Sequence, residues 1–180
     1  MTLVERVQKF LHQKSIKPTK ESKATKEDKG KRKNFIQNSN IHKSTISKIV
    51  NSSKRNPKIN TLIDIAKCFR CTTDEVLCRG NYFIISKEYK FNDISLNKIN
   101  NNLRNFINAK LKEENLTPSN LSKELGFSEN LITGFLNNHN KSLSSEVIFA
   151  LADYFKVSID EMIGRISTQN QEPQILEKIE

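Results

Sequence analysis

Residues 41–57, IHKSTISKIVNSSKRNP, combine cations, hydroxyl groups and amides with few apolar side chains. Ile46, Ile49 and Val50 fall on one face of a helix over residues 43–51, so the polar side chains of that helix point away from its packed side. Lysine can bind a guanine edge or a phosphate, serine and threonine can bind either, and asparagine pairs best with adenine. The candidate DNA-binding residues here are Lys43, Ser44, Thr45, Ser47, Lys48 and Asn51, followed by Lys54 and Arg55 in the turn after the helix.

The charge of the chain is divided unevenly between its halves. The 180 residues carry a formal net charge of +10. Residues 1–90 contribute +13, from 21 basic and 8 acidic side chains, and residues 91–180 contribute −3, from 9 basic and 12 acidic side chains. A basic half favours a polyanionic partner, most often nucleic acid. The simpler alternative is a solvated basic surface without a specific partner, and charge alone does not separate the two.

An internal repeat divides the chain into two units. Residues 45–79 align without a gap onto residues 131–165 at an offset of 86. Upstream of these segments the offset becomes 100, so the first unit contains an insertion of 14 residues. The repeat predicts two small helical cores rather than one large core. Identical pairs include Ile46 and Ile132, Asn51 and Asn137, Asp74 and Asp160, and Arg79 and Arg165.

Each unit has the apolar pattern of five short helices, which predicts an all-α fold. In the second unit we expect helices near residues 100–114, 118–125, 129–137, 145–155 and 159–164. In the first unit we expect a helix near residues 2–15, a short second helix over about 34–39 and a third over 43–51. These expected elements would hold the polar segment described above on the outside of a small bundle.

A turn joins the second and third expected helices of each unit. Gly126 supplies it in the second unit, and Asn40 takes the equivalent place in the first. Asparagine is the other residue that enters the left-handed region at low cost, so we expect the same turn in both units. Two short helices joined in this way have the spacing of a helix-turn-helix. The alternative for residues 43–51 is an ordinary amphipathic helix with a solvated basic face, and the repeat, the turn and the basic half favour the DNA-binding interpretation.

The insertion in the first unit is charged and almost free of apolar residues. Residues 17–33, KPTKESKATKEDKGKRK, cannot bury a hydrophobic face, which predicts a mobile segment. Its cations could form an arm that neutralises phosphates or enters a minor groove. The alternative is a solvated loop that raises only non-specific affinity. These cations are Lys17, Lys20, Lys23, Lys26, Lys29, Lys31, Arg32 and Lys33.

The stretch IHKSTISKIVNSSKRNP, together with TLIDIAKCFRCTTDEVL, resembles the phage-repressor or xenobiotic-response-element (XRE) helix-turn-helix family, also called lambda-repressor-like. The resemblance is close over most of residues 34–78 and looser over 100–164. It implies two tandem five-helix domains of the Cro/cI type that bind operator DNA, usually as dimers, to regulate transcription. By position, the family's base and phosphate contacts fall on the candidate residues of 43–55 named above. His42 stands where the family usually has serine.

The third helix of the second unit lacks the cations of its counterpart. Glu129 stands near its start, and Gly134 takes the place of Lys48. Two interpretations stay open for this unit. It contacts bases through its remaining polar residues, or it keeps the fold for dimerisation, partner binding or weak support of DNA binding. The residues that could contact DNA are Asn130, Thr133, Asn137, His139 and Lys141.

Metal and catalytic chemistry are not indicated. Cys68 and Cys71 form a CxxC, with Cys78 seven residues later, but no fourth ligand lies nearby and zinc is not expected. The repeat places Cys68 and Cys71 at packing positions, and a redox switch on DNA affinity is the less favoured alternative. The sequence contains no glycine-rich phosphate loop and no nucleophile–base pattern, so we expect neither an enzyme nor a cofactor.

Membrane insertion is not expected either. No apolar run approaches the ~20 residues of a membrane span, and the N-terminus lacks a signal-peptide core. We therefore expect a cytoplasmic protein without a membrane partner. The abundance of Lys, Asn and Ile favours a bacterial or phage genome rich in AT.

These observations combine into one predicted organisation. We expect a DNA-binding domain over 1–80, a linker over 81–98, a second, divergent helix-turn-helix domain over 99–166 and a tail over 167–180. The predicted function is a sequence-specific transcriptional regulator, most simply a repressor, that binds double-stranded DNA and as a homodimer would occupy a palindromic operator. The alternative is an antitoxin or adaptor whose second domain binds a protein partner, with DNA contact secondary.

Overall fold

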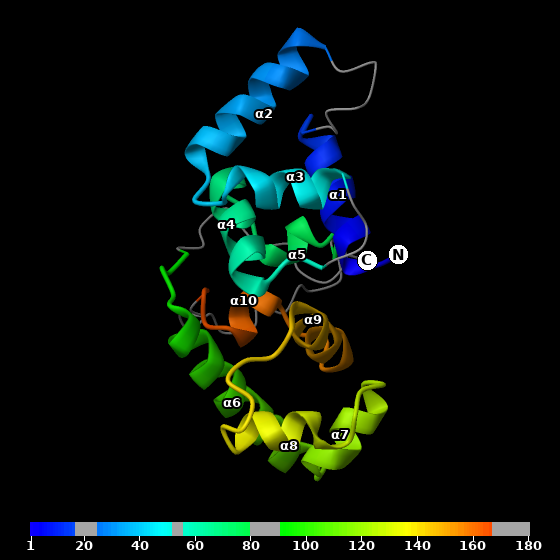
Figure 1. Ribbon diagram of the computed structural model, residues 1–180. Helices are drawn as coiled ribbons and strands as arrows, with labels where there is room; N and C mark the ends of the chain where they lie inside the picture. Colours follow the sequence, from blue (N-terminus) through cyan, green and yellow to red (C-terminus); the bar gives the residue numbers. More distant parts are fainter. Residues whose placement is uncertain (17–24, 52–55, 80–90, 167–180) are drawn as a thin grey trace, which may run out of the picture.

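The computed structural model describes residues 1–16, 25–51, 56–79 and 91–166. Within these residues the chain forms ten α-helices, five in each half (Figure 1). The first half contains α1 (Leu3–Gln13), α2 (Lys26–Asn38), α3 (Lys43–Asn51), α4 (Ile59–Phe69) and α5 (Thr73–Val76). The second contains α6 (Leu96–Glu113), α7 (Pro118–Glu124), α8 (Asn130–Leu136), α9 (Ser145–Tyr154) and α10 (Ile159–Met162). The prediction of an all-α fold of two five-helix units is confirmed.

The prediction for the basic insertion is wrong over its second half. Residues 26–33 belong to α2, which runs from Lys26 to Asn38 instead of only about 34–39. The reason is local, because the Thr25 side chain accepts a hydrogen bond from the Asp28 N–H and the Asp28 carboxylate accepts one from the Thr25 N–H. This capping box stabilises the helix start without any hydrophobic face. An exposed Glu27–Lys31 ion pair (2.7 Å) lies one turn further along α2.

The turn between the second and third helices differs between the domains, contrary to our expectation. In the second domain Gly126 adopts a positive φ of 77°, and its N–H and that of Phe127 bond to carbonyls in α7. Asn40 is not among the described residues with positive φ. Instead, α2 ends at Ser39 in an extended conformation, so the chain leaves the longer helix directly without a left-handed residue.

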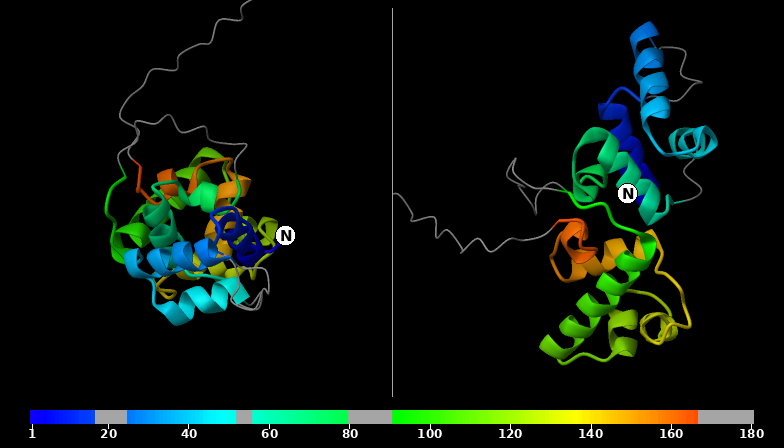
Figure 2. Two further views of the ribbon diagram at one scale, coloured as in Figure 1. Left: turned by 90° about the horizontal axis from the view of Figure 1, so that it is seen from above. Right: turned by 90° about the vertical axis from the view of Figure 1, so that its left-hand side faces the viewer.

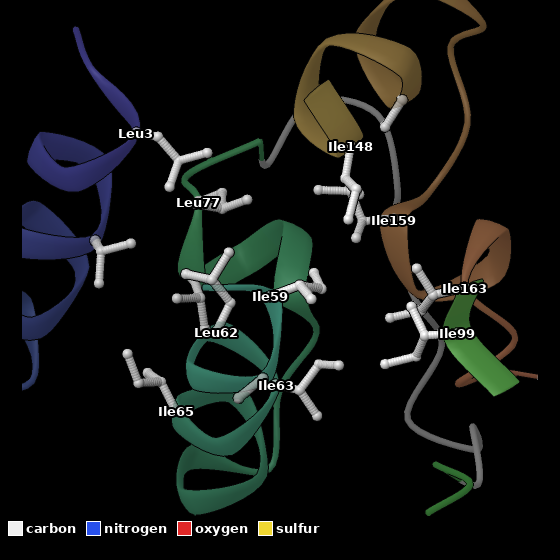
Figure 3. Close-up of a cluster of buried hydrophobic side chains, with 14 of the residues drawn as sticks. Leu3, Ile59, Leu62, Ile63, Ile65, Leu77, Ile99, Ile148, Ile159 and Ile163 are labelled. Carbon is white, nitrogen blue, oxygen red and sulfur yellow. The ribbon is translucent and has the colours of Figure 1, made fainter. Parts of the chain in front are cut away.

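One continuous hydrophobic cluster joins the two domains. Ile59 and Ile63 lie on the side of α4 that faces Ile148, Ile159 and Ile163 of the second domain (Figure 3). All five side chains are buried. Helices α4 and α5 therefore pack against α9 and α10 through an apolar interface.

The two helix-turn-helix units present their third helices on one face of the molecule. Helices α3 and α8 both lie toward the viewer in Figure 1, and the side view in Figure 2 places both at the same edge. They run across this face in opposite directions, α3 in the upper domain and α8 in the lower (Figure 1). The arrangement is that of two copies related by an approximate two-fold axis perpendicular to the face.

The second domain begins earlier than the expected first helix of its unit. Helix α6 starts at Leu96, after the N-cap Ser95. Phe91 pairs with Ile166 in an isolated antiparallel bridge, and the Asn92 N–H donates to the Arg165 carbonyl (2.8 Å). The apolar stretch at 81–86 and the expected tail over 167–180 lie outside the described residues.

Candidate nucleic-acid interface

Helix α3 has the two-sided character predicted for it. Ile46, Ile49 and Val50 are buried. The Gln8 side chain of α1 donates to the Ile49 carbonyl (2.8 Å), which fixes the last turn of α3 on the bundle. None of the predicted contact residues on α3 is buried, so the outer side of the helix is polar. Lys43, Ser44, Lys48 and Asn51 are exposed, and Thr45 and Ser47 are half-buried.

The start of α3 is capped by an unusual residue. His42 Nδ1 accepts a hydrogen bond from the Ser44 N–H (3.3 Å) and lies 2.7 Å from Ser44 Oγ. The imidazole thus does what the serine usual at this position in the family would do, satisfying an N–H that the helix cannot satisfy itself. At the other end, Asn51 Nδ2 donates to Ser47 Oγ (3.0 Å). These bonds orient Ser44 and Asn51 along the outer surface. Lys54 and Arg55 lie outside the described residues.

Helix α2 adds a basic surface that α7 lacks. Its N-terminal two turns extend beyond the bundle, away from the second domain (Figures 1 and 2). Lys26, Lys29, Lys31 and Lys33 are exposed on it. Lys17, Lys20 and Lys23 of the predicted arm lie outside the described residues. Residues 26–33 of the insertion therefore form a basic helix rather than a solvated loop.

Helix α8 presents amides and a hydroxyl in place of cations. Asn130, Asn137, His139 and Lys141 are exposed, and Thr133 is half-buried. The first helix of this domain anchors α8, as that of the first domain anchors α3. Arg104 Nε of α6 donates to the Phe135 carbonyl (3.0 Å), and Phe135 is the equivalent of Ile49. The Arg104 guanidinium also lies 4.4 Å from the centre of the Phe135 ring.

The acid at the start of α8 has a partner. Lys123 Nζ lies 2.6 Å from a Glu129 carboxylate oxygen, and both side chains are more than half exposed. Such an exposed pair contributes little stability. It does neutralise the charge that would otherwise oppose a phosphate at this end of the helix.

Asn140 was missed by the sequence analysis. A Cβ atom on Gly134 would lie 2.8 Å from Asn140 Nδ2, so the exposed Asn140 amide covers the place where Gly134 has no side chain. The Asn140 N–H also donates to the Gly134 carbonyl (2.9 Å). The second domain therefore has an amide near the position that Lys48 occupies in the first. No signal in the sequence indicates this contact, because it depends on how the loop after α8 folds.

A polar network crosses the interface between the domains, and each domain contributes one aspartate to it. The buried Asp74 carboxylate of α5 accepts hydrogen bonds from Ser158 Oγ (2.6 Å) and from the Ile159 N–H (3.0 Å) at the start of α10. It also forms an ion pair with Arg79. The Arg79 guanidinium in turn donates to the Val157 carbonyl (3.2 Å).

The second half of the network repeats the first with the domains exchanged. The buried Asp160 carboxylate accepts from the Thr73 N–H (2.6 Å) and the Thr73 hydroxyl (2.9 Å), and Arg165 lies 2.7 Å from it. Arg165 Nη2 donates to the Cys71 carbonyl (3.2 Å). Burial raises the pKa of Asp160, while Arg165 and the Thr73 N–H oppose that rise. The repeated aspartates therefore have cross-domain partners that the sequence did not reveal.

The cysteines are free thiols. Cys71 is buried, and Cys68 and Cys78 are half-buried. Burial raises the pKa of Cys71 to about 12, and Glu75 adds to that rise. Burial likewise raises the pKa of Cys68. Since the thiolate is the reactive form, both environments favour packing over redox chemistry. Over the described ranges, no group of histidine, cysteine and carboxylate side chains has the arrangement of a metal site.

These features define the class: a protein with tandem helix-turn-helix domains, each of which holds a polar third helix outward on a small apolar bundle. Comparison with known families agrees. A family described as "Cro/C1-type HTH DNA-binding domain" matches residues 107–167, and one described as "Helix-turn-helix" matches residues 37–76.

Two bacterial relatives share part of the chain. An uncharacterized HTH-type transcriptional regulator of Rickettsia prowazekii (strain Madrid E) is 37% identical over 82 residues, which are 44% of this chain and 78% of the relative. An uncharacterized HTH-type transcriptional regulator of Rickettsia conorii (strain ATCC VR-613 / Malish 7) is 35% identical over 82 residues, 44% of this chain and 66% of the relative. No solved structure matches the chain significantly. The chain belongs to the Cro/C1-type helix-turn-helix family of DNA-binding regulators.

None of the described helices has both the length and the apolar character that crossing a lipid bilayer requires.

Proposed function

We propose that this protein is a sequence-specific, double-stranded-DNA-binding repressor of transcription whose main recognition helix is α3. The observation that carries the proposal is the exposed polar surface of α3, with Lys43, Ser44 and Lys48 outward over a buried stripe of Ile46 and Ile49. A helix of this kind can enter the major groove and contact base edges, while its aliphatic side keeps it on the bundle.

The basic first domain supports the same function. The exposed lysines of α2 extend the positive surface beyond α3, and phosphate neutralisation by lysine provides most of the affinity of such proteins. Lys54 and Arg55, which follow α3 in the sequence, are proposed phosphate contacts. Occupation of promoter DNA would exclude polymerase, which is repression without catalysis. The site of action would be the cytoplasm of a bacterial cell.

The second domain is proposed to contact DNA as well, through amides rather than cations. The candidates are Asn130, Thr133, Asn137 and Lys141, to which the structure adds Asn140 over Gly134. An asparagine amide can pair with an adenine edge without adding charge.

The test begins with selection of bound duplexes from a random library, followed by affinity measurements by fluorescence anisotropy. Lys48→Ala should weaken binding to the selected sequence by on the order of 1–3 kcal/mol and relax base preference where Lys48 contacts the DNA. Lys112→Ala is the matched control, since Lys112 is an exposed lysine in the last turn of α6 and outside both recognition helices. It should leave base preference unchanged.

Two results would contradict the proposal. One is the failure of selection to enrich any sequence. The other is equal behaviour of Lys48→Ala and Lys112→Ala on selected and random DNA. Recovery of a protein partner that is needed for function while Lys48→Ala is silent would instead favour the adaptor or antitoxin alternative.

A further inference from the structure

We propose that a single copy of this chain binds its operator as an internal pseudo-dimer: α3 and α8, held in fixed register by the α5–α10 interface, contact two unlike half-sites of one duplex. This inference rests on the DNA-binding function proposed above. It differs from the homodimer and palindrome expected from sequence, because the second half-site is contacted by the same chain.

The reciprocal polar network is the first observation behind the inference. Asp74 accepts from the Ile159 N–H, and Asp160 accepts from the Thr73 N–H, with 86 residues separating both the two aspartates and the two donors. Each domain therefore offers the same aspartate to the same backbone position of the other. Such self-complementary pairing is the pattern of a two-fold interface, here formed within one chain.

The burial of this network argues against independent motion of the domains. Asp160 and Arg165 are 0% exposed, and Asp74 and Arg79 are 3% and 5% exposed. Separating the domains would leave each aspartate without its cross-domain donors. Separation would also expose the buried contact of Ile59 and Ile63 with the second domain to water, so the lost apolar burial, together with the lost hydrogen bonds, keeps the domains paired.

Further contacts around the network tie the domains together. Ser145 Oγ, at the start of α9, donates to the Pro57 carbonyl just before α4 (2.6 Å). The Arg6 guanidinium of α1 lies 4.9 Å from the centre of the Phe149 ring. Together with the apolar contact between α4 and α9–α10 (Figure 3), these contacts surround the polar centre.

The direction of the recognition helices is the second observation. The two-fold relation sets α3 and α8 on one face in opposite directions (Figures 1 and 2). Two helices placed in this way match the opposed strand polarity of two half-sites in inverted orientation on one side of a duplex. A second chain is not needed to complete such a site.

The side chains of the two helices determine that the half-sites differ. Lys43 and Lys48 project from α3, whereas Asn130 projects from α8 and the Asn140 amide covers Gly134. Lysine favours guanine and phosphate, and asparagine favours adenine. The geometry is symmetric but the chemistry is not, so the operator should have inverted half-site positions with unlike sequences.

The experiment uses the full chain and the duplexes enriched by selection. We expect a bipartite motif with unlike halves at one fixed spacing, and native mass spectrometry should find one chain per duplex. Insertion of about 5 base pairs between the halves, roughly half a helical turn, places them on opposite sides of the DNA. Affinity should then fall at least ~10-fold, to that of the first half-site alone.

A pair of variants assigns the second half-site to α8. Asn130→Ala should weaken binding to the bipartite duplex roughly 10-fold, yet leave binding to a duplex with a scrambled second half-site unchanged. Asn108→Ala replaces an exposed asparagine in the middle of α6 and serves as the control. Both side chains are exposed, so both variants should keep the melting temperature of the parent protein.

The outcomes separate this inference from the proposed function. Two chains on a symmetric palindrome, a motif with one half-site only, or tolerance of the 5-base-pair insertion would overturn the pseudo-dimer and leave α3 as the recognition helix. The absence of any enriched sequence would overturn both.

Discussion

Arg79 and Arg165 occupy equivalent positions at the ends of the two domains, and each pairs with the aspartate five residues before it. Their surroundings differ. Arg79 Nε donates to Asp153 (3.0 Å), but the equivalent of Asp153 in the first domain is Lys67, which cannot accept a hydrogen bond from Arg165. Within the described part of the chain, Arg165 Nε is buried without a hydrogen-bond partner. The Phe91 ring lies 4.2 Å from this guanidinium and compensates in part as a cation–π contact.

The comparison teaches that the two copies kept the polar network between the domains and diverged around it. The aspartate–arginine pairs and the cross-domain hydrogen bonds to backbone N–H and carbonyl groups are the same in both halves. The additional partner of the arginine, the length of the second helix and the side chains on the third helix are not. The two copies therefore share the residues that pack the domains against each other and differ in the residues on the outward surfaces.

The largest expected effect is the loss of Asp160. Asp160→Asn leaves Arg165 without an anion in a fully buried site and turns an amide donor toward the Thr73 donors. We expect a loss of about 3–5 kcal/mol in the free energy of unfolding, measured by urea denaturation. Asp74→Asn should cost about 1 kcal/mol less, because Arg79 still has Asp153 as a partner. Equal losses, or a larger loss for Asp74→Asn, would contradict the asymmetry inferred for the two arginines.

The sequence could predict which residues of the two domains are equivalent and where α3 lies, but it could not predict which groups bond across the interface. The repeat at an offset of 86 identified Asp74 and Asp160 as equivalent residues, and the apolar stripe gave α3 its bounds of Lys43–Asn51. Each aspartate binds donors 84 to 87 residues away in the chain. Periodicity reports which side of a helix is buried, and it contains no information on which domain covers that side.

The error in α2 has a different cause. Residues 26–33 were judged by their lack of apolar side chains, which is the right criterion for a buried helix and the wrong one for an exposed helix stabilised at its end. The Thr25–Asp28 capping box was visible in the sequence. Asn140, in contrast, could not have been found, since its role depends on how the loop after α8 folds back over Gly134.

A smaller effect should separate the equivalent positions 153 and 67. Asp153→Ala removes the partner of Arg79 Nε and should lower the free energy of unfolding by about 1 kcal/mol, since the Asp153 side chain is 43% exposed and solvent screens the pair. Lys67→Ala breaks the exposed pair of Lys67 with Asp93 (2.5 Å) and should leave thermal unfolding unchanged. Comparable losses in the two variants would mean that the extra partner of Arg79 contributes nothing specific.

The smallest expected change tests the difference between α3 and α8. Alanine is favoured over glycine in a helix interior, so Gly134→Ala should raise the free energy of unfolding by up to ~1 kcal/mol. The new Cβ would lie 2.8 Å from Asn140 Nδ2, the end of a flexible exposed side chain that can move aside. Displacing this amide should weaken binding to duplexes with the second half-site by a few-fold. Asn140→Ala is the control, because it should reproduce the loss of affinity without the gain in stability. Unchanged DNA binding in both variants would remove Asn140 from the recognition surface, and α8 would then contact DNA through its own residues alone.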